Sequence, residues 1–305
     1  MNVSTAYLFD RATERMGTLQ NKLATTQAQL STAKQVLSPS DSPDQAAAIQ
    51  RLRGEIERQD SHAKTLEVAL RRYSAEETAI RSANDIVMRI KELALQAAND
   101  TYSPDDRQAM AVEMKALRDQ LLSLGNSRDD SGNYLFSGTR VKTPPFAEDA
   151  TGGVSYAGDQ TRTRIPAGVE RTVAYTRSGT DVMARVIRSD DGSSMGFFDA
   201  LDALIADTIS GDTSGISVGI DSTSQMISNL TFSLAEVGSD QNVVQSQLDV
   251  LEETALRLKS TLSNVEDLDY AEAVTRMNKE IMAMEAAMGS FAKISGLSLF
   301  DYIRG

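Results

Sequence analysis

The chain has 305 residues, and 41% of them are hydrophobic, which is enough for a core of one large or two to three small domains. Its formal net charge of -12 argues against a nucleic-acid binder, because such proteins carry a basic face. It has no cysteine, which excludes disulfides and thiolate chemistry, and the low aromatic fraction of 5% is typical of long Ala-, Leu- and Gln-rich helices.

The first predicted helix covers residues 5–37 and carries a narrow apolar seam at three- and four-residue spacing. Its positions are Phe9, Ala12, Met16, Leu19, Leu23, Thr26, Leu30, Ala33 and Leu37. Such an a/d heptad pattern indicates a helix that packs against a partner helix. The Ser- and Pro-rich stretch 38–44 then ends the helix.

Two more helices are predicted before residue 126. The second covers residues 45–98 and repeats the three-four spacing, with polar interruptions at Gln59, Glu77 and Asn84. The third begins after Ser103 and Pro104, which are favourable N-cap and first-turn residues, and runs to residue 124. We expect these helices to close an intramolecular bundle.

Residues 126–195 lose the helical period and become rich in Gly, Ser, Thr and Asp. Short alternating runs separated by turn residues predict a small antiparallel β domain. The runs are Tyr134–Phe136, Val154–Tyr156, Thr161–Ile165 and Thr172–Tyr175. A short helix over 197–209 and a glycine-rich link near 211–219 complete this region.

The heptad pattern returns in the C-terminal part, over residues 227–265, and slips in phase at 266–270. Such a slip unwinds a coiled coil or marks a boundary between two packing regions. A last seam then contains Tyr270, Val274, Met277, Ile281, Met284, Met288 and Phe291. We expect the two ends of the chain to pair through their seams.

No catalytic or metal-binding pattern is found. His62 is the only histidine and is expected on the surface of the second helix, so a His-based triad or metal site cannot be built. The run Asp129–Asn133 lacks the alternating ligands of a calcium loop and is interpreted as a turn. An enzyme or ligand-binding domain within residues 126–210 stays open as an alternative, and a pocket of converging polar groups there would favour it. No cofactor is expected.

The N-terminal residues lack a basic region followed by an apolar one, so no cleaved signal peptide is expected. No apolar run approaches 18 residues, so no membrane helix is expected either.

Three segments resemble the flagellin superfamily, and within it the proteins of the hook–filament junction. They are Lys34–Pro43, where a helix ends in a Pro-Ser-Asp turn; Leu117–Leu122 followed by Gly132–Thr139 and Pro145-Phe146; and Val265–Val274. The outer region 147–195 matches in character only, and the ending Leu299–Gly305 is more aromatic than usual for the family.

The resemblance implies a mainly α fold in which the N- and C-terminal parts form a long coiled-coil-like bundle around an inserted antiparallel β domain. Residues 1–44 and 266–305 would be terminal helices, disordered in the monomer and forming the inner core on assembly. Residues 45–130 and 220–265 would form the bundle, and 131–219 the outer β-rich domain.

The resemblance also implies a structural adaptor without enzymatic activity, located outside the cell in the bacterial flagellum. Its partners would be hook-associated protein 1, flagellin, its own copies in a ring and an export chaperone, with no nucleic acid or membrane. A short flagellin is the alternative within the family. The expected assembly interface consists of Phe9, Met16, Leu19, Leu23, Leu30, Leu37, Met277, Ile281, Met284, Met288 and Phe291.

Overall fold

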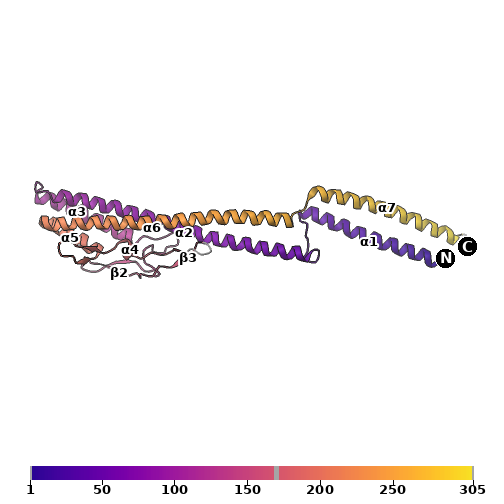
Figure 1. Ribbon diagram of the computed structural model, residues 1–305, viewed down its shortest axis with the longest axis horizontal. Coiled ribbons are helices and arrows are strands. Elements are labelled where there is room, and N and C mark those ends of the chain that lie inside the picture. Colours follow the sequence, from indigo (N-terminus) through magenta and orange to yellow (C-terminus); the bar gives the residue numbers. More distant parts are fainter. Residues whose placement is uncertain (1, 168–171, 304–305) are drawn as a thin grey trace. The chain divides into compact units, whose positions relative to one another are not determined.

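The computed structural model describes residues 2–167 and 172–303 of the chain (Figure 1). Helices dominate this described part. Their bounds are α1 Asn2–Thr32, α2 Pro43–Ala97, α3 Pro104–Gly125, α4 Gly179–Val182, α5 Phe197–Ser210, α6 Thr213–Glu266 and α7 Tyr270–Ile303.

Six short strands lie between α3 and α5. They are β1 Phe146–Glu148, β2 Val154–Tyr156, β3 Arg164–Pro166, β4 Thr172–Ala174, β5 Val186–Ile187 and β6 Ser194–Met195. Each strand pairs with its sequence neighbour in an antiparallel two-stranded ladder, β1 with β2, β3 with β4 and β5 with β6. The predicted fold, mainly α with an inserted antiparallel β region, is therefore confirmed.

The chain forms two compact units. Unit 1 consists of Met1–Ser61 and Glu253–Gly305, and unit 2 of His62–Glu252. Both α2 and α6 contribute residues to each unit. The predicted three-part division at residues 44, 130, 219 and 265 stays a prediction.

Unit 2 holds a continuous hydrophobic core. Apolar side chains from α2, α3, α5 and α6 meet there, and the ladders lie along the same helices (Figure 1). Fully covered members include Tyr73, Ile80, Val87, Met114, Leu121, Leu201, Leu204, Met226, Leu230 and Val237. The three-four spacing of α2 and α6 thus buries one stripe of each helix.

The start of α3 follows the predicted capping chemistry. The Ser103 hydroxyl accepts a hydrogen bond from the Asp106 amide at 3.2 Å, and the Asp106 carboxylate accepts one from the Ser103 amide at 3.0 Å. This reciprocal pair satisfies two amides that the first helical turn leaves without a partner.

The prediction that the first helix continues to residue 37 is wrong. Helix α1 ends at Thr32, and Ala33 adopts a left-handed φ of 58°. The Leu268 amide donates to the Ala33 carbonyl, and the Gln35 amide donates to the Glu266 carbonyl. Pairing with the segment between α6 and α7 thus replaces the last helical turn that the seam predicted.

The prediction of a glycine-rich link near 211–219 is also wrong for all but the first residues of that range. Gly211 ends α5 with a φ of 75°, but α6 begins at Thr213 and includes Gly219. A Cβ on Gly219 would lie 2.5 Å from Leu204 Cδ1, so this glycine lets α5 and α6 pack closely. Likewise, the run Tyr134–Phe136 forms no strand, and Tyr134 makes only an isolated bridge with Arg128.

Candidate assembly surface

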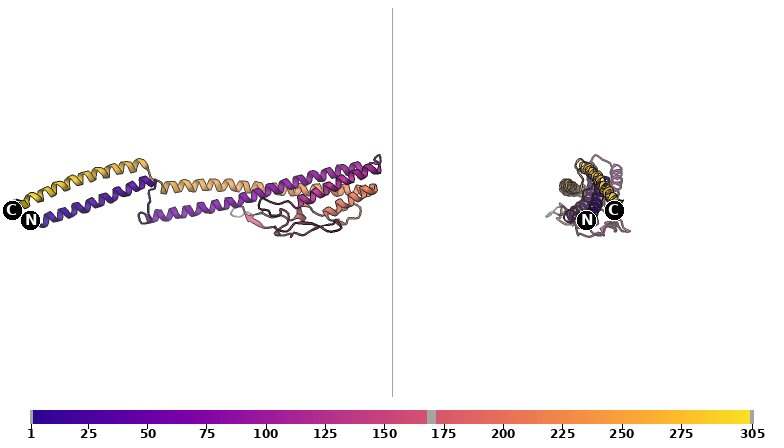
Figure 2. Two further views of the ribbon diagram at one scale, coloured as in Figure 1. Left: turned by 180° about the vertical axis from the view of Figure 1, so that it is seen from behind. Right: turned by 90° about the vertical axis from the view of Figure 1, so that its right-hand side faces the viewer.

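Helices α1 and α7 lie side by side as an antiparallel pair (Figures 1 and 2). At one end the rings of Phe9 and Phe291 pack with centroids 4.9 Å apart. At the other end the Tyr270 hydroxyl donates to the Leu30 carbonyl at 3.0 Å, and Arg276 Nη2 donates to Gln29 Oε1 at 2.9 Å. Direct contacts between residues far apart in sequence thus hold the two ends together.

The α1 side of this pair uses the predicted seam. Met16, Leu19, Leu23 and Leu30 are half-buried, and Thr26 is buried. Phe9 is 44% exposed although its ring touches Phe291. Leu37 lies beyond the end of α1 and is 37% exposed, so it belongs to the connection between α1 and α2 rather than to a helical seam.

The α7 side is rotated relative to the predicted seam. Ala273 and Met284 are buried and Ala287 is half-buried, whereas Val274 and Met288 are 41% and 50% exposed. Met284 thus faces the partner as predicted, whereas Ala273 and Ala287 replace Val274 and Met288 one residue earlier, where small alanines allow the two backbones to approach closely. Of the remaining predicted residues, Met277, Ile281 and Phe291 are half-buried.

The rotation leaves an apolar strip along α7 in which Val274 and Met288 are exposed and Ile281 is half-buried. Val274, Ile281 and Met288 repeat every seven residues, so they share one face of the helix. Tyr270 and Met282 nearby are 52% and 60% exposed. An exposed apolar strip of this length is the signature of a surface that another chain covers.

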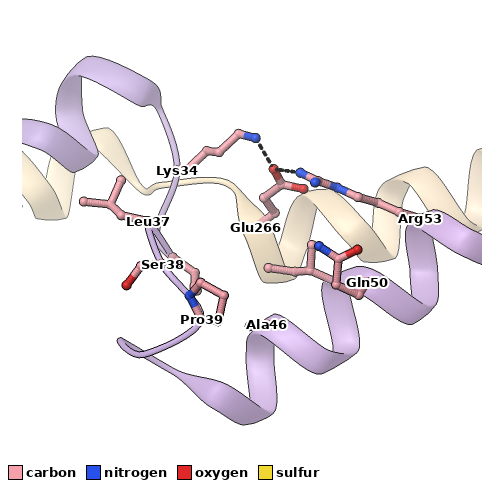
Figure 3. Close-up of a pocket in the computed structure, with 10 residues that line it drawn as sticks. Lys34, Leu37, Ser38, Pro39, Ala46, Gln50, Arg53 and Glu266 are labelled. Atoms are coloured by element: carbon pink, nitrogen blue, oxygen red, sulfur yellow. Dashed lines mark hydrogen bonds and ion pairs between the residues drawn. The ribbon is translucent and has the colours of Figure 1, made fainter.

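A joint connects the α1–α7 pair to the rest of unit 1. The carboxylate of Glu266, the last residue of α6, accepts from Lys34 Nζ at 2.6 Å and from Arg53 Nη2 at 2.5 Å (Figure 3). The Lys34 hydrogen bond, with help from Arg53, holds the pKa of Glu266 below its usual value. Lys34 also forms a backbone bridge with Asp267.

A small pocket lies beside this joint (Figure 3). Leu37, Pro39, Ala46 and Gln50 line it together with the three charged residues. The joint thus ties together the α1–α2 connection, the first turns of α2 and the end of α6. The heptad pattern gave no signal for these contacts.

Unit 2 contains a buried charge cluster around Glu76, which is fully buried on α2. Its carboxylate accepts from Arg72 Nε at 3.2 Å and from Arg177 Nε at 3.1 Å. Arg177 continues to Glu236 and Asp240 on α6, and Arg72 to Asp129 after α3. Desolvation raises the pKa of Glu76 to about 7 although both arginines act to lower it.

A third buried arginine, Arg118 on α3, forms a second cluster and joins three further elements. It makes a two-pronged contact with Asp202 of α5 at 3.0 and 3.1 Å, and donates to Glu148 of β1 at 2.7 Å. It also donates to the carbonyl of Gly152 in the β1–β2 turn at 2.6 Å. Both arginine clusters therefore fasten the inserted β region to the helices of unit 2.

Asp129 has a structural role in the loop that faintly resembles a calcium site. Its Oδ1 accepts from the amides of Ser131 and Asn133, both at 2.9 Å, and its Oδ2 pairs with Arg72. The turn interpretation therefore accounts for this carboxylate. Over residues 2–167 and 172–303 no group of three or more candidate ligands for a metal occurs, and no helix there has the length and apolarity to cross a membrane.

Two family models match the chain. The bacterial flagellin N-terminal helical region matches residues 3–141, and the bacterial flagellin C-terminal helical region matches residues 220–303. The chain belongs to the flagellin superfamily.

Within this superfamily, the chain is 26% identical over its full length to flagellar hook-associated protein 3 of Salmonella typhimurium, and the match covers all of that protein. It is 25% identical to flagellin FlaB1 of Treponema pallidum, over 75% of this chain and 73% of that one. The fold is similar to that of FlgL from Xanthomonas campestris, with a TM-score of 0.61 and 21% identity, over 70% of this chain and 99% of that chain.

Two of the three flagellin-like segments coincide with the joint. Lys34–Pro43 forms the connection between α1 and α2, and Val265–Val274 contains Glu266 and the connection between α6 and α7. The two matched regions leave 142–219 between them, which contains all six strands. In this flagellin-superfamily chain the shared features are thus the helices and their joint.

Proposed function

We propose that the chain is a structural adaptor of the bacterial flagellum, without enzymatic activity, that joins the hook to the flagellin filament. The observation that carries this proposal is the apolar strip on α7, in which Val274 and Met288 are exposed and Ile281 is half-buried, together with exposed Phe9. Each such side chain adds roughly 1.5–3 kcal/mol only when a neighbour covers it fully. The strip therefore favours assembly with other chains.

The proposed partners are hook-associated protein 1 on one side, flagellin on the other, and further copies of the chain in a ring. The full-length similarity to a hook-associated protein 3 supports this placement. The chain would act outside the cell, after export with the help of a chaperone. The interface would include the predicted residues on α1 and α7 and the exposed strip, with Leu37 at the joint.

A flagellin, the subunit of the filament itself, is the second candidate. The similarity to FlaB1 favours it, although that match covers less of the chain than the match to hook-associated protein 3. The number of copies per filament separates the two, because a junction needs few copies and a filament needs very many.

An enzyme sited in residues 126–210 has less support. Glu76, whose pKa burial raises to about 7, lies on α2 outside this region and is fully buried between two arginines. Such a group serves the packing of unit 2 and does not meet a substrate.

A deletion strain tests the proposal. Electron microscopy of cells grown in liquid culture should show hooks without filaments, and the medium should contain flagellin monomers. Expression of the intact chain from a plasmid should restore filaments. Normal filaments in the deletion strain would refute the junction role, and loss of flagellin protein itself would make the chain the filament subunit.

A further inference from the structure

A groove runs between the first turns of α2 and the last turns of α6, within unit 1. Small and apolar residues line most of it, namely Ala48, Leu52, Gly54, Leu258, Thr261 and Val265. Glu55 and Arg58, an ion pair on α2, stand at its edge. The residues from Ala48 to Arg58 span about 15 Å of helix, which is enough to receive two turns of another helix.

Gly54 is a feature that the chain's own packing does not require. It lies inside α2, where glycine favours the helix less than alanine does. A Cβ at this position would meet no heavy atom within 4 Å. In contrast to Gly219, which makes room for Leu204, Gly54 faces open space in its own chain. A close approach by another molecule would give this glycine a role.

Leu256 provides a matching projection on the opposite side of α6. It precedes Leu258 by two residues, and at about 100° per residue the two side chains point some 200° apart around the helix. Leu256 is 61% exposed. Glu253 and Arg257, an exposed ion pair at 3.2 Å, flank it. Unit 1 thus carries a groove on one side and a leucine projection on the other.

The charges beside the two surfaces are complementary. Helices α2 and α6 run antiparallel in unit 1, because Arg53 near the start of α2 contacts Glu266 at the end of α6. In two copies that point the same way, α6 of one would therefore cross α2 of the other in antiparallel order. Glu253 then meets Arg58 of the other copy while Arg257 meets Glu55. Opposed pairs of this kind set orientation and register more than affinity.

We propose that a second copy of this chain docks in the groove, with its Leu256 inserted over Gly54 and its Glu253–Arg257 pair opposite Arg58 and Glu55. The inference rests on the proposed function, which requires copies to assemble. Because the groove and the projection are different surfaces, the contact is head-to-tail and repeats from copy to copy. Contacts of this type build rings or helical tubes rather than closed dimers.

Cysteine cross-linking tests the contact, and the cysteine-free chain provides a clean background. The double variant Leu256→Cys/Val265→Cys places one thiol on the projection and one in the groove beside Gly54, since Arg53 of α2 pairs with Glu266 of α6. Positions nine residues apart on a helix lie about 13 Å apart, which is too far for a disulfide within one chain. Flagella isolated from the complemented deletion strain and oxidised should therefore give a ladder of cross-linked multimers on a denaturing gel.

The single variants are the matched controls. Neither Leu256→Cys nor Val265→Cys should form a ladder. A dimer from Leu256→Cys alone would mean that like surfaces meet, and it would overturn the head-to-tail contact. Filaments that form normally without a ladder in the double variant would overturn this proposal but leave the junction role intact. Failure of the intact chain to restore filaments would refute the junction role instead.

Two further changes in the double-cysteine background test the groove and the charges. Gly54→Leu should block the groove and abolish the ladder without lowering the melting temperature of the monomer, because the space around its Cβ is open. Glu57→Leu, which places the same side chain at an exposed α2 position outside the groove, should keep the ladder. An unchanged ladder in Gly54→Leu would overturn the proposal.

The charge pair offers a rescue experiment. Arg58→Glu and Glu253→Arg should each weaken the ladder, and the combination should restore it because the two charges are exchanged. Equal loss in the single and combined variants would show that Glu253 and Arg58 do not meet between copies, and would overturn the proposed register.

Discussion

The Glu76→Gln substitution provides a direct test of the buried charge cluster in unit 2. Glu76 is fully buried and accepts hydrogen bonds from Arg72 and Arg177. Glutamine has the same shape but stays neutral at every pH. The substitution therefore mimics the protonated form of Glu76, and it should change how stability depends on pH.

The sign and size of this pH dependence follow from the pKa of Glu76. Burial raises the pKa of Glu76 from 4.5 to about 7 in the folded chain. A carboxyl with a raised pKa holds its proton more tightly when folded, so its contribution to stability is full below about pH 4.5 and is lost as the pH rises through about 7. At 1.36 kcal/mol per pKa unit, the loss is about 3 kcal/mol. We therefore expect the stability of Glu76→Gln relative to the intact chain to rise by about 3 kcal/mol between pH 4.5 and 8.

Urea unfolding followed by far-UV circular dichroism, at steps from pH 4.5 to 8, measures this difference. Glu77→Gln is the matched control, since it makes the same chemical change one residue later on α2, at a side chain that is 30% exposed. Parallel stability curves for the intact chain and Glu76→Gln would refute the reasoning. A variant that loses stability as pH rises would show that pairing with the arginines outweighs desolvation.

Three other predictions concern the joint, the packing of α5 and the chain ends. Glu266→Gln removes the charge shared by Lys34 and Arg53, so proteases should cut residues 33–42 faster in the variant than in the intact chain, and equal cleavage rates would contradict this. Since the pKa of Glu266 is lowered from 4.5, acidification of the intact chain should also loosen the joint. Gly219→Ala places a Cβ 2.5 Å from Leu204, and urea unfolding should show a loss of about 1–3 kcal/mol, which unchanged stability would disprove. Limited proteolysis of the purified monomer should remove roughly the first 40 and last 35 residues, as expected for ends that need an assembly partner, whereas survival of both ends would count against disorder in the monomer.

The sequence was sufficient to predict most helices. Heptad spacing located α2 and α3 to within a few residues and the start of α7, although α7 continues to Ile303, beyond the predicted seam that ends at Phe291; the Ser103-Pro104 pair marked the start of α3. Spacing also identified the face of α1 that meets α7. These features are local, because a helix and its apolar stripe depend on residues three and four positions apart.

The orientation of α7 depended on tertiary contacts. The series Ala273, Glu280 and Ala287 and the series Val274, Ile281 and Met288 have the same seven-residue spacing and differ by one position. Side-chain size favoured the second series as the partner-facing one. Close approach to α1 instead covers Ala273 and Ala287 and leaves Val274 and Met288 exposed, whereas Glu280 and Ile281 are both half-buried.

What the sequence by itself determined about this chain is its helical content, the pairing of its two ends and, through the segments at the joint, its resemblance to the flagellin superfamily. Only the tertiary structure decided where α1 ends, which residues lock the joint and how the β region is fastened. Glu76 and Arg177 are 101 residues apart, and Arg53 and Glu266 are 213 apart. No periodic pattern encodes such pairs, because each depends on folding that brings distant segments together and removes them from water.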